Sequence, residues 1–554
     1  MLFLQNFLGY LRSLSLAGVL AGTLFFGMAL TPSLLPRTYL LQGVLCGVVF
    51  ALGYGLGVAG RWLWEYLQIP VPGQVVRERV RLVVEVLCAV VLLACLWQAA
   101  GWQNSIRELM HLPPLASTHP VKTGLIAAAT AAALFAGAWL FRRVLFLAAG
   151  WLRRFMPLRI ANVLGTVVAV FVAWTVLDDV IFRIGLRMAD SSLRKIDALM
   201  EPDVTRPTED FRTGSAVSLI DWETLGRRGR EFAASGPRAE EISRFSGSAA
   251  MEPIRVYAGL NSAETPEARA QLALRELLRA GGFEREVLLI AIPTGTGWLD
   301  PHAMDTVEFL HHGNIATVAV QYSYLSSWMA LLVEPDYGKE TARALFEAVY
   351  GHWTSLPKTA RPRLYLHGLS LGALNSQASA DLYDVLADPF SGALWSGPPF
   401  ASKAWRMATD SRAPDSPAWL PRFRDSSLIR FANQETTAAR PGVAWGPLRI
   451  VYLQYASDPI VFIEPEALYR QPVWMKGPRG PDVSPQFRWF PVVTFLQLTL
   501  DVLLATHAPM GYGHIYAPPH YIDAWVEVTA PEGWPPEEII RLKEYFERRA
   551  SAPE

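Results

Sequence analysis

Charged side chains are scarce in this chain of 554 residues. They make up 18% of the sequence, against roughly a quarter in soluble globular domains. The scarcity is uneven: residues 1–182 hold 13 Lys and Arg and 6 Asp and Glu, which leaves 37 and 44 for residues 183–554. So few charges cannot cover a water-soluble surface of that size. This excludes a purely soluble protein and predicts membrane spans.

Cysteine is also rare. The three cysteines, Cys46, Cys88 and Cys95, all lie in apolar stretches. This excludes a CxxC pair, a zinc-type ligand spacing and a disulfide framework, so we expect neither a metal nor a cofactor. The formal net charge is zero and residues 183–554 are acidic, which argues against nucleic acid as the main partner.

Long apolar runs fill the first part of the chain. Five can be drawn, at roughly 14–35, 39–60, 82–101, 124–140 and 161–176. Each approaches the ~20 residues that a helix needs to cross hydrocarbon, although the fifth run is short. The first run lacks a clear A-x-A cleavage site, so we expect it to stay as a span rather than be removed as a signal peptide. About five transmembrane helices are therefore predicted in residues 1–182.

The cationic residues between these runs predict an orientation. Two loops are rich in arginine, and the loops on the opposite side carry only three cationic residues. The first set is Arg61, Arg77, Arg79, Arg81, Arg142, Arg143, Arg153, Arg154 and Arg159, and the second is Arg37, Arg107 and Lys122. Because positive loops stay in the cytoplasm, five spans would place the chain after about residue 183 outside the cytoplasm.

Glu85 is the only acidic residue well inside an apolar run. An intramembrane acid can mark a proton or ion path. Glu85, however, lies one helical turn from Arg81, which favours a paired carboxylate at the interface. The repeated, broken, polar helices of a transporter are not evident, so we favour a membrane anchor.

The second part of the chain alternates strands and helices. Residues 183–250 are polar and irregular and are expected to form a linker or a lid, with a folded domain over 251–554. Apolar strands are predicted at 254–260, 287–292, 315–320, 363–367, 393–395 and 448–455, with helices at about 266–280, 305–311, 340–352 and 371–386. This spacing predicts a mostly parallel sheet covered by helices on both faces. Ligands of such sheets bind beyond the carboxyl ends of the strands.

A G-x-S-x-G motif, Gly368-Leu369-Ser370-Leu371-Gly372, follows the predicted strand at 363–367 and precedes a helix. In this setting two glycines permit a sharp turn that projects the serine hydroxyl. The motif alone is weak, since chance would produce it in roughly one chain in five of this length and glycine content. Its strand-turn-helix context makes Ser370 a candidate nucleophile.

A serine nucleophile needs a base and an orienting acid, which follow it in the order Asp or Glu, then His, in this fold class. Three histidines, His507, His514 and His520, follow the last clear strand. We favour His514 in its glycine-rich loop, with His507 as the alternative; either could instead be a hydrogen-bonded loop histidine. Asp458 directly follows that strand and is the candidate acid, although with Pro459 it also fits a helix N-cap.

An oxyanion hole requires two backbone N–H groups that point at the tetrahedral oxygen. We expect one from Leu371 and the other from the loop at 293–298, where Thr294 and Gly295 are the candidate donors. No nucleotide-binding glycine pattern surrounds Gly295 and Gly297, which favours the oxyanion loop.

On these residues the second part of the chain resembles an α/β-hydrolase. The whole chain resembles a family of bacterial membrane α/β-hydrolases with a multi-spanning N-terminal domain. The matching segments are residues 31–37, 255–257, 293–298, 321–324, 367–372, 375–376, 457–459 and 513–516. The resemblance implies a triad of Ser370, Asp458 and His514 in a catalytic domain over 251–554. One departure is that no obvious strand lies between Asp458 and His514, where 491–505 is apolar and helical.

The resemblance implies acyl-ester chemistry through an acyl-Ser370 intermediate, and the spans bring lipid or lipid-linked substrates within reach. A set of aromatic and apolar residues could line an acyl pocket or simply pack under a lid. It comprises Trp298, Tyr322, Tyr324, Trp328 and residues 329–333. Alternatives are an acyltransferase with the same triad, or a non-enzymatic membrane protein or transporter whose hydrolase-like domain binds a partner.

Overall fold

The computed structural model describes residues 14–70, 73–152, 199–201, 203–325, 336–381 and 385–551, with single positions at 157, 167, 171 and 197. The chain divides into two compact units. The helical unit comprises Met1–Gly185 and Ile463–Ala505, and the sheet unit comprises Leu186–Phe462 and Thr506–Glu554. A segment within the predicted catalytic domain therefore packs with the N-terminal helices, and in the chain it separates Asp458 from His514.

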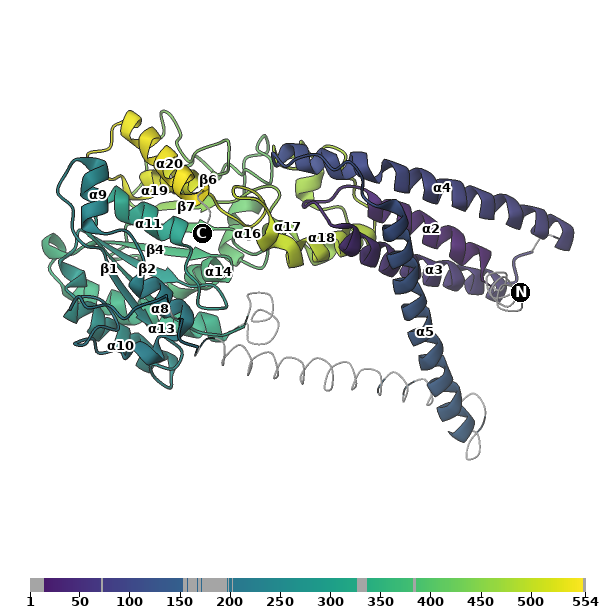
Figure 1. The fold of residues 1–554 in the computed structure, drawn as a ribbon, viewed down its shortest axis with the longest axis horizontal. Helices are drawn as coiled ribbons and strands as arrows, with labels where there is room; N and C mark the ends of the chain where they lie inside the picture. The colour runs from purple at the N-terminus through teal and green to yellow at the C-terminus, as the bar shows by residue number, and fades with distance from the viewer. Residues whose placement is uncertain are drawn as a thin grey trace. The chain divides into compact units, whose positions relative to one another are not determined.

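Apolar helices build the N-terminal part of the helical unit (Figure 1). They are α2 (Leu16–Leu30), α3 (Tyr39–Tyr66), α4 (Gln74–Leu109) and α5 (Pro120–Leu152). Among the described residues, three stretches are long and apolar enough to cross a membrane, namely Tyr39–Tyr66, Val75–Leu109 and Pro120–Leu147. The first predicted span corresponds to the shorter α2, and the fifth lies outside the described residues except at two positions. These helices indicate membrane association.

The predicted pairing of Glu85 is confirmed on α4. Arg81 Nε lies 2.7 Å from Glu85 Oε1, at the i,i+4 spacing, and both side chains are partly exposed. A paired carboxylate on the outer surface of a helix gives no support to an internal ion path.

The segment Ile463–Ala505 holds two short 3-10 helices, η5 (Pro465–Leu468) and η6 (Val473–Met475), followed by α18 (Val493–Leu504). Helix α18 packs against α2 and α3. Its Asp501 forms a fully buried ion pair with Arg37, whose Nε and Nη2 lie 3.1 and 3.0 Å from Asp501 Oδ1. The Leu34 N–H donates to the second carboxylate oxygen at 3.0 Å. These bonds give the segment 31–37 a structural role, because a buried charge needs a partner.

A seven-stranded parallel sheet forms the core of the sheet unit, in the order β1-β3-β2-β4-β5-β7-β6. The strands are β1 (Ile254–Ala258), β2 (Val287–Ile292), β3 (Ile315–Val320), β4 (Arg363–Leu369), β5 (Gly392–Ser396), β6 (Ile429–Ala432) and β7 (Arg449–Leu453). The predicted parallel sheet is confirmed, with β2 and β3 at the expected bounds. The short edge strand β6 was not expected, because four residues among polar loops show too little periodicity.

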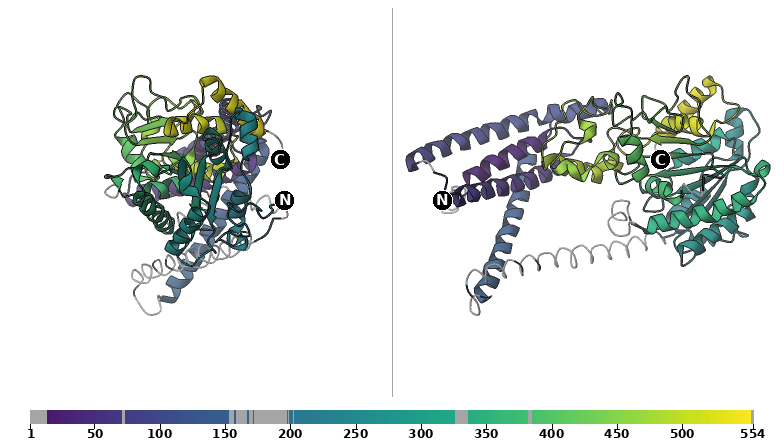
Figure 2. Two further views of the ribbon diagram at one scale, coloured as in Figure 1. Left: turned by 90° about the vertical axis from the view of Figure 1, so that its left-hand side faces the viewer. Right: turned by 180° about the vertical axis from the view of Figure 1, so that it is seen from behind.

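Helices cover both faces of the sheet (Figures 1 and 2). One layer contains α10 (Pro266–Arg279), α13 (Tyr337–Ser355) and α14 (Leu371–Ser379), and the other contains α11 (Pro301–Leu310), α19 (Pro518–Thr529) and α20 (Pro536–Ser551). Two short helices, α16 (Lys403–Asp410) and α17 (Pro459–Phe462), lie in the connections after β5 and β7. Residues 459–513, all described, contain no strand, so the departure between Asp458 and His514 is real.

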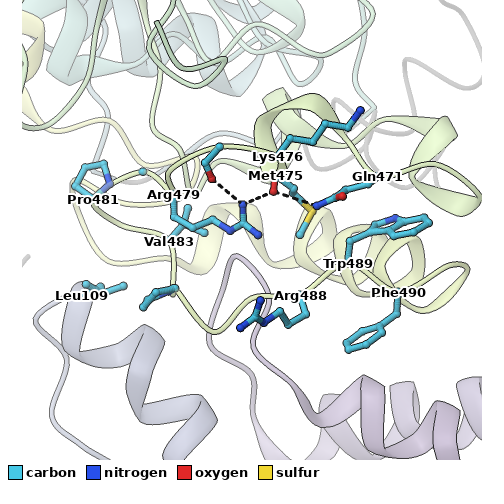
Figure 3. A pocket seen from close by; sticks show the side chains of 13 residues that line it. Leu109, Gln471, Met475, Lys476, Arg479, Pro481, Val483, Arg488, Trp489 and Phe490 are labelled. Carbon is cyan, nitrogen blue, oxygen red and sulfur yellow. Dashed lines mark hydrogen bonds between the residues drawn. The ribbon is translucent and has the colours of Figure 1, made fainter. Parts of the chain in front are cut away.

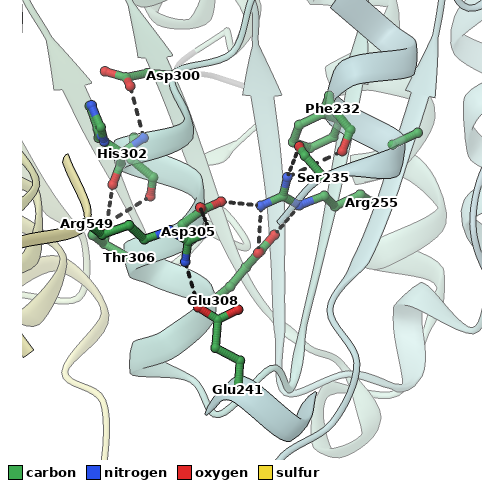
Figure 4. Close-up of polar contacts among 12 residues, drawn as sticks. Phe232, Ser235, Glu241, Arg255, Asp300, His302, Asp305, Thr306, Glu308 and Arg549 are labelled. Carbon is green, nitrogen blue, oxygen red and sulfur yellow. Dashed lines mark hydrogen bonds and ion pairs between the residues drawn. The ribbon is translucent and has the colours of Figure 1, made fainter. Parts of the chain in front are cut away.

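The region predicted as a linker or lid is partly folded onto the sheet. Helix α8 (Gly226–Ala234) packs on β1, and α9 (Ala239–Ser246) follows it. Arg255 of β1 lies 2.6 Å from Asp305 and 2.8 Å from Glu308 of α11, and its Nη1 donates to the Phe232 carbonyl of α8 at 3.3 Å (Figure 4). The buried guanidinium of Arg255 thus bonds both α8 and α11 to the edge strand β1. These bonds explain the arginine in the segment 255–257.

Candidate active site

Ser370 lies at the sharp turn between β4 and α14, and it is buried. Its φ of +58° is unusual for a residue with a side chain, as is typical of a strained nucleophile turn. The two flanking glycines are required because a Cβ atom at either position would clash with neighbouring backbone atoms. A Cβ on Gly368 would lie 2.3 Å from the Gly372 carbonyl carbon, and a Cβ on Gly372 would lie 2.2 Å from the Ile292 carbonyl oxygen. The predicted turn is therefore present in the geometry that its glycines permit.

The same close approach brings the predicted oxyanion loop to the start of α14. Gly372 abuts the carbonyls of Ile292 and Pro293, so the loop that begins at Pro293 lies beside Leu371. Leu371 is the first residue of α14, where helix geometry leaves the backbone N–H without an intrahelical acceptor. The helix N-terminus also favours negative charge at this place.

Thr294 is less well suited to donate to an oxyanion. Its N–H already donates to the Trp298 carbonyl at 2.9 Å, and the Gly297 N–H donates back to the Thr294 carbonyl at 2.9 Å. The Tyr257 hydroxyl stabilises this turn, because it donates a hydrogen bond to the Gly297 carbonyl at 2.8 Å. Thr294 is therefore less favourably placed than the sequence suggested, and the roles of both predicted loop donors, Thr294 and Gly295, stay predictions.

Asp458 and His514 are brought together although 56 residues separate them. His514 Nδ1 lies 2.6 Å from Asp458 Oδ2, and both residues are buried. The Tyr516 hydroxyl donates to the same oxygen at 2.7 Å, and the Ile460 N–H donates to Oδ1 at 2.9 Å. Asp458 thus caps α17 with one oxygen and contacts His514 with the other. The helix N-cap is confirmed, and the role of Asp458 as a triad acid stays a prediction.

The end of β5 connects this pair to the nucleophile turn. The Ser370 N–H donates to the Ser396 carbonyl at 3.0 Å. The next residue, Gly397, lies against the His514 ring, since a Cβ there would meet His514 Cε1 at 2.6 Å. Within the described residues, His514 Nε2 is buried and has no hydrogen-bond partner. The ring nitrogen that a base would use is therefore not engaged by another group.

The two other late histidines have different surroundings. His507 is exposed at the end of η7 (Ala505–His507). His520 Nδ1 lies 2.6 Å from the Tyr455 hydroxyl, and burial lowers its pKa to about 4. Only His514 contacts the candidate acid, so the geometry favours it over the alternative.

The support of Asp458 includes groups that the sequence did not single out for this role. Burial and the neighbouring carboxylate raise the pKa of Tyr516 well above its ordinary value, so its hydroxyl stays protonated and donates. The Ser457 hydroxyl accepts the Gly513 N–H at 2.9 Å and fixes the histidine loop. The pattern Gly513-His514-Ile515-Tyr516 gave no periodic signal for this contact, because Gly513 and His514 lie in a turn and the alternation of side chains belongs to strands.

The predicted aromatic pocket is described only in part. Tyr322 is buried beside Gly338 and Asn375, and the Tyr324 hydroxyl donates to Asn261 at 2.9 Å. Trp298 is half-buried, whereas Trp328 and residues 329–333 lie outside the described residues. In the described part of the chain, no group of three His, Cys, Asp or Glu side chains is placed to hold a metal ion.

Comparison with known protein families identifies the family to which the fold belongs. Residues 254–542 match the model described as the alpha/beta-hydrolase family, and residues 30–237 match the model described as the N-terminus of that family. The chain belongs to the alpha/beta-hydrolase family. The N-terminal match covers α3, α4 and α5, and the other match covers the whole parallel sheet. No curated protein and no solved structure matched the chain.

Proposed function

We propose that this chain is a membrane-anchored serine hydrolase that cleaves acyl esters through an acyl-Ser370 intermediate. The observation that carries the proposal is the 2.6 Å contact between His514 and Asp458 beside a strained, glycine-flanked serine. A hydrolase fold alone does not determine an activity, whereas this set of groups supplies a nucleophile, a base and an orienting acid.

The proposed reaction begins when His514 Nε2 accepts the Ser370 hydroxyl proton and the serine oxygen attacks the ester carbonyl. Asp458 stabilises the imidazolium through Nδ1, and Tyr516 and Ile460 hold the carboxylate in place. The Leu371 N–H stabilises the tetrahedral oxyanion, and the loop at 293–298 supplies the second donor. His514 then protonates the departing alcohol. Water attacks the acyl-serine in the second half of the reaction and regenerates the enzyme.

The proposed substrates are acyl esters of lipids or of lipid-linked molecules. The family's hydrolase fold is joined here to three helices that are apolar and long enough to cross a membrane. An enzyme held beside a bilayer meets such esters at high local concentration. The proposed location of the domain is extracytoplasmic, from the arginine pattern, and acyl transfer would use the same intermediate with an acceptor hydroxyl in place of water.

The test is labelling of the purified full chain with a fluorophosphonate probe, which reacts with activated serines. Wild type should be labelled, and Ser370→Ala and His514→Ala should each reduce the labelling rate by at least about 1000-fold, since triad members act as a unit. The matched controls are Ser355→Ala, at an exposed serine ending α13, and His507→Ala, at the alternative histidine. Both controls should label at the wild-type rate.

Two results would contradict the proposal. Equal labelling of wild type and Ser370→Ala would show that the probe reacts elsewhere. Loss of labelling in His507→Ala but not in His514→Ala would reassign the base. Thermal unfolding of each variant in detergent shows whether a loss of labelling reflects chemistry or misfolding.

A further inference from the structure

A pocket of about 780 Å³ lies inside the helical unit, between the end of α4 and the segment Ile463–Ala505 (Figure 3). This volume is within the roughly 300–1000 Å³ of small-molecule sites. Three of its lining side chains are cationic, namely Lys476, Arg479 and Arg488, and none carries a carboxylate. All charged side chains that line this concave pocket are therefore cationic.

These three cations lack acidic partners. Within the described residues, no ion pair is formed by Lys476, Arg479 or Arg488, and Lys476 and Arg488 are exposed. Arg479 is held by the Met475 and Phe487 carbonyls at 2.5 and 3.0 Å, while its Nε is buried without a partner. Burial and the charge of Arg488 lower the pKa of Arg479. An anion in the pocket would relieve this repulsion and use the remaining donors.

Apolar groups adjoin the cations. Trp489 and Phe490 line one side of the pocket and Leu109 lines the opposite side (Figure 3). Phe490 packs against the buried apolar cluster to which α2, α3, α4, α5 and α18 contribute. Leu109 ends Val75–Leu109, one of the three apolar stretches long enough to cross a membrane. Cations beside aromatic side chains at the end of a span are the arrangement that suits a lipid headgroup.

We propose that this pocket binds the phosphate group of an anionic phospholipid, with Arg479, Arg488 and Lys476 around the phosphate and Trp489 and Phe490 beside the start of the acyl chains. The pocket contains none of the proposed catalytic residues and does not depend on the proposed hydrolysis. A phosphate diester supplies the oxygens that arginine donors match, and the aromatic side chains add a preference for an amphipathic ligand.

The experiment is native mass spectrometry of the purified full chain in detergent, titrated separately with phosphatidylglycerol, phosphatidylcholine and glycerol 3-phosphate. The test variant is Lys476→Gln with Arg488→Gln, because both side chains are exposed and neither holds the backbone. The matched control is Lys403→Gln with Arg470→Gln, an exposed lysine and an exposed arginine outside the pocket and outside the apolar spans. The two double variants lose the same charge.

Wild type should bind phosphatidylglycerol at least about tenfold more tightly than phosphatidylcholine or glycerol 3-phosphate. The test variant should weaken phosphatidylglycerol binding about 30-fold, since each cation near a lipid surface contributes about 1 kcal/mol, and the control less than twofold. Equal weakening by the two double variants would overturn the site. Equal affinity for glycerol 3-phosphate and phosphatidylglycerol would overturn the lipid assignment in favour of a soluble phosphate ester. Both double variants should unfold at the wild-type temperature.

Discussion

At the scale of single residues, the tightest steric requirement near the candidate site falls on Gly372. The backbone of this glycine abuts the Ile292 carbonyl so closely that a methyl group would lie 2.2 Å from the oxygen. Neither backbone can give way, because Ile292 ends β2 and Gly372 belongs to the first turn of α14. The glycine is therefore required for packing between the nucleophile turn and the loop at 293–298.

We expect Gly372→Ala to destabilise the protein by about 1–3 kcal/mol, as overpacking does, and to lower fluorophosphonate labelling because Leu371 is displaced. The matched control is Gly351→Ala on α13, where a Cβ meets nothing within 4 Å. That change should stabilise by about 0.5–1 kcal/mol, the ordinary gain of alanine over glycine in a helix. Unfolding in detergent, followed by fluorescence, measures both. Equal stability of the two variants would contradict the packing argument.

At the scale of elements, the segment Ile463–Ala505 is held to the N-terminal helices by polar as well as apolar contacts. The Arg37–Asp501 pair is fully buried, and Gln497 Nε2 donates to the Thr31 carbonyl at 3.0 Å. Such a pair is costly to desolvate, so we expect its main effect to be on which surface α18 packs against rather than on net stability. Removal of one partner is far more damaging than removal of both.

We expect Asp501→Ala to destabilise the helical unit by about 3–5 kcal/mol, because Arg37 is left buried and unpaired. The control is Thr499→Ala, on the exposed face of the same helix, with a change within about 0.5 kcal/mol. The double change of Arg37→Met with Asp501→Leu should recover most of the loss. Unfolding temperatures in detergent report the result. A double variant as unstable as Asp501→Ala would argue against charge burial as the cause.

At the scale of the whole molecule, buried neutral histidines make stability depend on pH. Burial lowers the pKa of His311 to about 3 and the pKa values of His367 and His520 to about 4. In the unfolded chain these groups titrate near 6.5, so only the unfolded state takes up protons as the pH falls below that value. The stabilisation is complete above about pH 6.5 and is lost toward pH 4.

Each of these histidines should therefore cost about 2 kcal/mol of stability between pH 7 and pH 5. Urea unfolding at the two pH values measures the loss, and His520→Gln should reduce it by about that amount. His507→Gln, at an exposed histidine, should leave the difference between the two pH values unchanged. A wild type as stable at pH 5 as at pH 7 would contradict the burial of these groups.

Much of the sheet unit could be predicted from local pattern. Strands β2 and β3 are continuous apolar runs, and the turn at Ser370 follows from two glycines between a strand and a helix. The exposed apolar surfaces of α3, α4 and α5 were likewise visible as long runs, although the side of the membrane on which the sheet unit lies stays a prediction. A cysteine introduced in the sheet unit and labelled from outside intact cells would decide it.

The sequence by itself determined the class of fold and identified Ser370, Asp458 and His514, in that order along the chain, as candidate residues. Short-range periodicity and turn chemistry encode these features. Only the tertiary structure decided that Asp458 contacts His514 rather than His507, that Tyr516 shares the carboxylate, and that α18 belongs with the N-terminal helices. The physical reason is that a local pattern fixes which face of an element is apolar, whereas its partner is chosen by contacts between residues far apart in the chain.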